Sequence, residues 1–333
     1  MGTTVVREQA RVKTLSLASM IDLFIVSKEI EGKSQKTLAW YRSMLITYAD
    51  HARQGEDVPS DELSLEGAKS FISYLQRRTS KYENHQFRKV EDEALSPHTI
   101  HAYVRTLKAF GAWLFEEGYT TDHPFRRLKP PKLPETMIEI LSEDEITRLL
   151  NAINVDTPLG ARQYLIVLLL LDTGIRASEL CTLTMANTNL KEGYIKVRGK
   201  GKKERMVPFG ATTKKALMRY IQTYRPDPAT DQVGELILTL DGTSLTYDGL
   251  AQVCKRLAVA ASIPRLHLHL FRHTFAVRYL MNGGDVMTLR LILGHTTLDV
   301  TRLYLHLSES HVQVQHHKFS PVDRLDIGRR RKR

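Results

Sequence analysis

The sequence predicts a mainly α-helical protein with a small antiparallel β-sheet, an α+β fold. Apolar residues recur at three- and four-residue spacing along most of the first half, which is the period of helices with one buried face. Two short runs with strand composition, 194–198 and 204–208, flank a glycine-rich turn, as in a β-hairpin. With 333 residues, the chain is longer than one compact core usually accommodates, so we expect two domains.

The first half begins with a polar stretch and continues as a series of amphipathic helices. Residues 1–14 show little periodicity, and we expect a flexible N-terminus there. Apolar residues from Leu17 to Ile25 predict a first helix, and Ser34 is placed to cap a second. A further apolar set runs from Leu65 to Leu75. These segments alone would indicate a helical bundle.

The last helix of this half has the clearest start signal. Ser96-Pro97 combines a capping serine with a proline at the first helical position, and Gly118 ends the helix. The preceding segment 77–93 is highly charged and lacks an apolar stripe. It fits a loop or helix extension near DNA, or equally a solvated insertion.

A basic, proline-rich stretch, residues 121–140, separates the two halves. Its prolines and cations alternate: Pro124, Arg126, Arg127, Lys129, Pro130, Pro131, Lys132 and Pro134. Prolines make such a linker stiff, and its positive charge suits either a phosphate backbone or a solvated hinge. Ser142 and Glu145 then have the spacing of a capping box, which predicts the first helix of the second domain.

The second half mixes helices with short strands. Helical patterns cover 143–153, 160–172, 177–184, 212–224 and 247–260. Leu236 to Leu240 is a candidate third strand beside the hairpin. Helix stops at Gly283-Gly284 and Gly294 divide the last part into short helices that fold back on one another. We expect this folding to form one cationic pocket that holds one tyrosine.

The charge is strongly positive and unevenly placed. The formal net charge is +11, which suggests a polyanionic partner, most simply nucleic acid. Residues 1–125 carry 16 Lys and Arg against 17 Asp and Glu, whereas residues 126–333 carry 32 against 20. The excess therefore belongs to the linker, the second domain and the tail, which ends in Arg329–Arg333.

Cysteine content and hydropathy exclude other classes of protein. Cys181 and Cys254 lie in apolar helical contexts, which argues against a disulfide framework or a cysteine-based zinc site and favours a reducing cytoplasm. The apolar run 165–171 is far shorter than the roughly 20 residues that span a bilayer, so we expect no membrane segment. No GxxxxGK[ST] loop for a nucleotide is present.

A set of motifs in the second half points to one family. In order, the sequence reads TGIRASEL from Thr173, GKGKKER from Gly199, HLFRH from His269, LGH from Leu293 and YLH from Tyr304. Together these motifs resemble those of the tyrosine recombinases, the phage integrase and Xer-like family. Phe271 stands where the family usually has leucine, which changes packing rather than chemistry.

The resemblance implies a site-specific DNA recombinase with a covalent 3′-phosphotyrosine intermediate and neither metal nor ATP. Its motifs assign the nucleophile to Tyr304, the phosphate clamp to Arg176 and Arg272, and the general acid to Lys200, with Lys202 and Lys203 as competitors for that last role. By the same resemblance, His269 would assist proton transfer, His295 would hydrogen-bond the phosphate, and Glu179 would orient the site by accepting from a catalytic histidine or arginine.

The resemblance also implies domain roles and partners. Residues 15–120 would form a helical, SAM-like core-binding domain and 141–307 the catalytic domain, joined by the linker 121–140. Residues 308–333 would be a protomer-exchange segment and basic tail, with packing in cis as the alternative. The expected partners are a double-stranded recombination site, three further copies in a homotetramer with one dimer per site, and a homologous recombinase or an accessory DNA-bending protein. The setting would be bacterial, cytoplasmic and nucleoid-associated, often on a mobile element.

Other functions stay open on the sequence alone. A type IB topoisomerase or a telomere resolvase would share the pocket, and a catalytically silent DNA-binding regulator would share the fold. A metal-dependent nuclease or transposase is a further alternative, and chelation would separate it from a tyrosine mechanism. His267, His269 and His273 suggest a metal site, although the charge of Arg272 beside them would oppose a cation.

Overall fold

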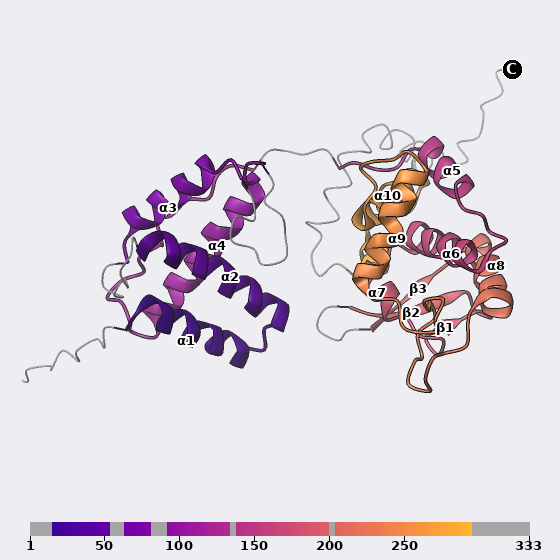
Figure 1. Ribbon diagram of the computed structural model, residues 1–333, viewed down its shortest axis with the longest axis horizontal. Helices are drawn as coiled ribbons and strands as arrows, with labels where there is room; N and C mark the ends of the chain where they lie inside the picture. Colours follow the sequence, from indigo (N-terminus) through magenta and orange to yellow (C-terminus); the bar gives the residue numbers. More distant parts are fainter. Residues whose placement is uncertain (1–14, 54–62, 81–91, 134–137, 200–203, 295–333) are drawn as a thin grey trace, which may run out of the picture. The chain divides into compact units, whose positions relative to one another are not determined.

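The computed structural model describes residues 15–53, 63–80, 92–133, 138–199 and 204–294 (Figure 1). The chain divides into two compact units, Met1–Thr136 and Met137–Arg333. The described elements are mostly helices with one small antiparallel sheet, which confirms the predicted fold class. Within these ranges no helix has the length and apolar character needed to cross a membrane.

The first unit is a bundle of helices. It contains α1 (Leu17–Ile30), α2 (Gln35–Arg53), α3 (Leu65–Arg77) and α4 (Pro97–Glu116). The Ser96 hydroxyl accepts from the Thr99 backbone N–H at 3.2 Å, with proline in the first turn of α4, which confirms the predicted helix start.

Aromatic rings fill the centre of this bundle. Phe24 on α1 meets Phe110 and Trp113 on α4 edge to face, with ring centroids 5.4 Å and 5.6 Å apart. Phe125 and Leu128, inside the stretch predicted as linker, are buried in the same core. The ordered core of the first unit therefore continues past α4, because these apolar side chains have a bundle to pack against.

The second unit is built around the apolar helix α6. Its helical elements are α5 (Glu143–Asn151), α6 (Pro158–Thr173), α7 (Ala177–Cys181), α8 (Ala211–Arg219), the π-helix η3 (Tyr220–Tyr224), α9 (Tyr247–Ala260), α10 (Leu268–Met281) and α11 (Val286–Leu293). Helix α6 contacts both α8 and α10, and its run from Leu165 to Leu170 is wholly buried (Figure 1). A helix with apolar residues on all sides must be surrounded in this way.

The sheet has the strand order β1–β2–β3 and is antiparallel throughout. Strands β2 (Tyr194–Arg198) and β3 (Glu204–Pro208) form the predicted hairpin, with Ile195 opposite Val207. The third strand is β1 (Thr188–Asn189), which pairs with β2.

The prediction of a third strand at Leu236 to Leu240 is wrong. Leu236, Ile237 and Leu238 are buried, but the segment forms only isolated bridges among the described residues. Its carbonyl groups are satisfied differently, since Arg225 donates to the oxygens of Glu235 and Leu236 at 2.8 Å and 3.0 Å. Burial of the apolar run explains why its composition resembles that of a strand.

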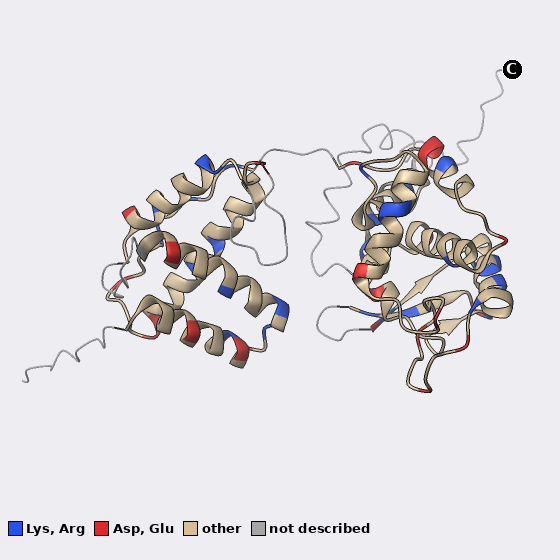
Figure 2. Cartoon of the chain, viewed as in Figure 1, with Lys and Arg blue, Asp and Glu red and all other residues tan. Residues whose placement is uncertain are grey.

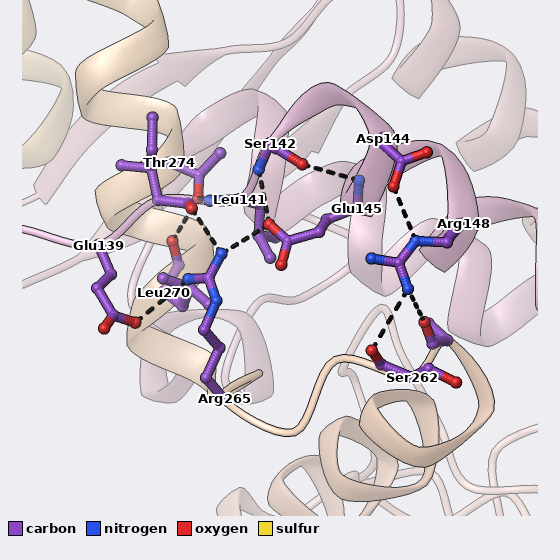
Figure 3. A network of polar contacts seen from close by, with 12 residues as sticks. Glu139, Leu141, Ser142, Asp144, Glu145, Arg148, Ser262, Arg265, Leu270 and Thr274 are labelled. Carbon is purple, nitrogen blue, oxygen red and sulfur yellow. Dashed lines mark hydrogen bonds and ion pairs between the residues drawn. The ribbon is translucent and has the colours of Figure 1, made fainter.

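A polar network joins the start of the second unit to α10 (Figure 3). Thr274 on α10 accepts from the Leu141 backbone N–H at 2.9 Å and donates to the Leu270 carbonyl at 2.7 Å. The Ser142–Glu145 capping box is present as predicted, and Arg265 donates to Glu145 at 2.6 Å. The hydrogen bond from Leu141 to Thr274 thereby attaches the first described residues of the second unit to α10, the helix that carries His269 and Arg272.

Glycine is required where α6 ends. Gly174 has φ +59°, and a Cβ there would lie 2.2 Å from the Phe275 ring and 2.9 Å from Leu293. The left-handed turn and the close approach of α10 and α11 both exclude a side chain. This turn leads directly into Arg176.

We expect Gly174→Ala to destabilise the second unit strongly. A left-handed alanine costs about 1–2 kcal/mol, and overpacking adds typically about 1–3 kcal/mol. Gly193→Ala is the matched control, because Gly193 also has positive φ (+74°) but a Cβ there would lie 3.7 Å from its nearest neighbour, the Phe209 oxygen. Thermal unfolding followed by circular dichroism should show the larger loss in Gly174→Ala, and equal losses would contradict the packing argument.

Candidate active site

Arg176 and Glu179 occupy the start of α7. Arg176 is the N-cap residue, its backbone N–H donates to Glu179 Oε2 at 2.8 Å, and its Nη1 donates to Glu179 Oε1 at 3.0 Å. The Glu179 side chain is 4% exposed, whereas the Arg176 side chain is 37% exposed. The buried carboxylate therefore fixes an arginine whose side chain still reaches the surface.

Arg205 on β3 completes the environment of Glu179. Its Nη1 and Nη2 donate to the two carboxylate oxygens at 2.9 Å and 2.8 Å, and its Nε donates to the Ile292 carbonyl at 2.6 Å. Burial alone would raise the pKa of Glu179. The hydrogen bonds from Arg205 and from the Arg176 backbone, together with both positive charges, outweigh burial and lower the pKa. Glu179 is therefore held as a carboxylate.

Arg272 lies deep in the second unit, at 2% exposure. Its Nη1 donates to the Gly174 carbonyl at 2.6 Å and its Nη2 to the Leu293 carbonyl at 2.8 Å. Leu293 is the last residue of α11, where the negative end of the helix dipole favours a cation. Arg272 thus connects the turn before Arg176 with the end of α11.

His269 and His273 lie one turn apart on α10 and touch. Their rings meet edge to face with centroids 4.5 Å apart. Partial desolvation lowers the pKa of His269, and the charges of Arg272 and Arg176 lower it further. Burial is the largest cause that lowers the pKa of His273 to about 4, and the electrostatic effect of His269 is the second largest. Both shifts favour the neutral form of the imidazole ring.

The structure brings Arg176, Glu179, His269 and Arg272 together. Arg272 donates to the Gly174 carbonyl in the turn that leads into Arg176, and the positive charges of both arginines lower the pKa of His269. The other predicted site residues, Lys200, His295 and Tyr304, lie outside the described residues. In the sequence, Lys200 follows Gly199 after β2, and His295 follows Gly294 after α11.

The metal-site alternative finds no support in the described histidines. His267, His269 and His273 do not form a group that could hold a metal ion, nor does any other cluster of His, Cys, Asp and Glu in the described ranges. The charged residues of α10 are both arginines, Arg272 and Arg278, and blue marks such cationic positions on the helix in Figure 2.

Sequence reasoning missed the part played by Arg205. A signal was present: strand residues alternate between faces, so Arg205 shares a face with the buried Val207. An arginine on the inner face of a strand needs a buried acceptor. Glu179 is that acceptor, with both its oxygens engaged.

The arrangement suits a reaction in which negative charge develops on a phosphate. Arginines are permanently charged and planar, and they bind two oxygens at once. Fixed donors of this kind stabilise developing charge without reorganising during the reaction. A neutral histidine beside them can accept a proton.

Comparisons with known proteins agree with this chemistry. A model of the phage integrase family matches residues 139–311. The curated tyrosine recombinase XerC of Oceanobacillus iheyensis is 31% identical over 306 residues, which cover 90% of this chain and 95% of the relative. The tyrosine recombinase XerD of Xanthomonas campestris pv. campestris is 34% identical over 305 residues, 87% and 88% of the two chains.

Solved structures share the fold. The Tn1549 transposon integrase, in complex with a circular intermediate DNA, gives a TM-score of 0.73 at 18% identity, over 92% of this chain and 99% of that one. The XerH site-specific recombinase, bound to a palindromic difH substrate, gives a TM-score of 0.68 at 18% identity, over 92% and 85%.

The pKa of His273 predicts how stability depends on pH. Because the pKa is lowered from 6.5 to about 4, the unfolded chain takes up a proton first as the pH falls. The contribution of neutral His273 to the free energy of unfolding is therefore complete above pH 6.5 and is lost progressively as the pH falls toward 4. We expect His273→Gln to lose less stability than the wild type between pH 7 and pH 5.

Urea unfolding of the intact chain measures this difference. Circular dichroism follows both units, whereas tryptophan fluorescence follows the first unit, because Trp40 and Trp113 are the chain's tryptophans. His98→Gln, at an exposed position on α4, is the control substitution. Equal pH sensitivity in wild type and His273→Gln would refute the prediction.

Proposed function

The chain belongs to the phage integrase family and is a site-specific tyrosine recombinase, and we propose that it breaks and rejoins DNA through a 3′-phosphotyrosine ester formed by Tyr304. The main support is the described half of the site. Arg176 and Arg272 are held near one another by Glu179 and by backbone carbonyls, beside the neutral His269. Such a cluster of fixed cations matches the demands of phosphate chemistry.

The proposed reaction exchanges one phosphate ester for another. The Tyr304 oxygen attacks phosphorus, a P–O bond to tyrosine forms, and the P–O bond to the 5′ oxygen breaks. The tyrosine proton passes to a base, for which neutral His269 is the candidate, and the leaving 5′ oxygen receives a proton from Lys200. The ester keeps the bond energy, so a strand hydroxyl can reverse the attack without a high-energy cofactor.

The two arginines act in different surroundings. Arg272 is buried and anchored on two carbonyls, so its position is set before DNA arrives. Arg176 is partly exposed and anchored on Glu179. In the proposed complex both donate to the non-bridging oxygens, where negative charge builds up. His295 would add a further hydrogen bond from beyond the end of α11.

The proposed partner is a double-stranded recombination site. The Tn1549 integrase structure is a complex with a circular intermediate DNA, and the XerH structure is a complex with a palindromic difH substrate, which supports this partner by analogy of fold. We further propose a homotetramer on two sites, in which residues 308–333 exchange between protomers. A chain that acts on DNA works where DNA is, so we expect it at the bacterial nucleoid. A mobile element would be the natural source of such a site.

Replacement of the nucleophile tests the mechanism. Tyr304→Phe should abolish the covalent protein–DNA adduct while DNA binding stays near the wild-type affinity, because only the attacking oxygen is lost. The assay incubates nicked suicide duplexes that cover candidate target sites with the chain and resolves adducts on a denaturing gel. An adduct that survives in Tyr304→Phe would place the nucleophile elsewhere.

A sulfur-substituted substrate tests the general acid separately. Lys200→Ala should cleave ordinary DNA slowly but should recover with a 5′-bridging sulfur at the scissile phosphate, because a thiolate leaves without a proton. Lys202→Ala is the matched control, and we expect it to cleave both substrates normally. Recovery in Lys202→Ala instead of Lys200→Ala would transfer the acid role to Lys202.

A further inference from the structure

One guanidinium joins three elements of the catalytic unit. Arg205 stands on β3, binds both oxygens of Glu179 on α7, and donates its Nε to the carbonyl of Ile292 on α11. Two of these bonds go to one carboxylate and the third goes to a different element, and all three come from one rigid, planar group. Its side chain is 13% exposed, so water competes little for these bonds.

The end of α11 fits closely against this side chain. Gly294 follows α11 in the left-handed conformation, at φ +65°, and a Cβ there would lie 3.1 Å from Arg205 Cδ, Nε and Cζ. Glycine therefore lets the backbone pass flush against the arginine. The next residue in the sequence is His295, so this contact lies immediately before a proposed phosphate ligand.

Glu179 transmits the position of Arg205 to Arg176. Its Oε1 accepts from both Arg205 Nη1 and Arg176 Nη1, at 2.9 Å and 3.0 Å. Its Oε2 accepts from Arg205 Nη2 and from the Arg176 backbone N–H, both at 2.8 Å. A shift of Arg205 would therefore move the carboxylate, and with it both the backbone and the side chain of Arg176.

We propose that Arg205 is a positioning residue that locks β3, α7 and the end of α11 together and so sets the orientation of Arg176. This inference rests on the proposed function, because it concerns the alignment of that site. Arg205 acts through Glu179 and the Ile292 carbonyl rather than on DNA. In the sequence, the strand it stands on follows directly after residues 200–203.

Lysine cannot replace this group. An ammonium is a single point of charge on a flexible stem, whereas the contacts here require a fork toward the carboxylate and a third donor toward α11. Arg205→Lys therefore retains the charge near Glu179 but loses the lock. Arg205→Met removes both the charge and the donors at similar side-chain length.

Single-turnover cleavage separates positioning from folding. The probe is a nicked suicide duplex that carries a site selected by the wild-type chain from a random-sequence library. At saturating chain, the amplitude of adduct formation reports the correctly folded fraction and the rate constant reports alignment. We expect the Arg205→Met rate constant to fall by about 10²-fold, the scale of an ångström-level misplacement, with an intermediate loss in Arg205→Lys. DNA affinity should stay near that of the wild type.

Arg225→Met is the matched control. Arg225 is a partly buried arginine of the same unit that also donates to backbone carbonyls, those of Glu235 and Leu236. Its replacement should lower stability and amplitude but leave the rate constant unchanged. Arg205 variants that lose amplitude alone, as this control does, would overturn the positioning role.

A measurement without DNA tests the lock independently. Hydrogen–deuterium exchange of the intact chain should speed up at the amides of α7 and at the end of α11 in Arg205→Met, but not in Arg225→Met. Unchanged exchange there would refute the lock whatever the activity. If Tyr304→Phe abolishes the adduct while both Arg205 variants cleave at the wild-type rate, the recombinase mechanism stands and this inference fails.

Discussion

The buried carboxylate of Glu179 is the interaction on which the site depends. A carboxylate at 4% exposure would be very unfavourable alone, and here it is compensated by Arg205 on one side and by Arg176 on the other. Removal of one partner from such a buried pair typically costs about 3–5 kcal/mol, because a charge is left unpaired. The ion pair therefore specifies an arrangement rather than simply adding stability, and the arrangement it specifies is that of the site.

The second organising feature is the end of α11. The carbonyl oxygens of its last two residues, Ile292 and Leu293, accept from Arg205 and Arg272 respectively. A helix C-terminus has unsatisfied carbonyls and a partial negative charge, so guanidinium groups are suitable partners. Two arginines from different elements thus converge on one helix end. Gly294 in the left-handed conformation makes that convergence sterically possible.

Local signals allowed much of the fold to be predicted from the sequence. The Ser142–Glu145 capping box and the hairpin at 194–208 depend on residues close in the chain, and both are present. The strand predicted at Leu236 to Leu240 failed, because burial and strand pairing select similar residues and only the tertiary structure distinguishes them. The burial of Phe125 could not be predicted from the sequence for a similar reason, since it depends on a bundle formed by helices distant in the chain.

The site residues, like the fold, include some that local motifs predict and some that only the tertiary structure brings into contact. The motifs identified Arg176, Glu179, His269 and Arg272, whose residue types are set by chemistry, and their roles stay predictions, as do those of Lys200, His295 and Tyr304. No motif indicated that Arg205 would bind Glu179, because the two are 26 residues apart and on different elements. Contacts of this kind are made by the fold and must be read from it.

The described half of the site is built from rigid parts, and this has a chemical reason. Arg272 is part of α10, whose position is set by packing against the buried helix α6 and by the hydrogen bond from the Leu141 backbone N–H to Thr274. Electrostatic stabilisation is effective when the donors are fixed before charge develops, since no energy is then spent on their reorganisation. A pair of arginines anchored on backbone carbonyls and one buried carboxylate meets that condition. The apolar core around α6 therefore contributes to chemistry as well as to stability, because it holds the charges in place.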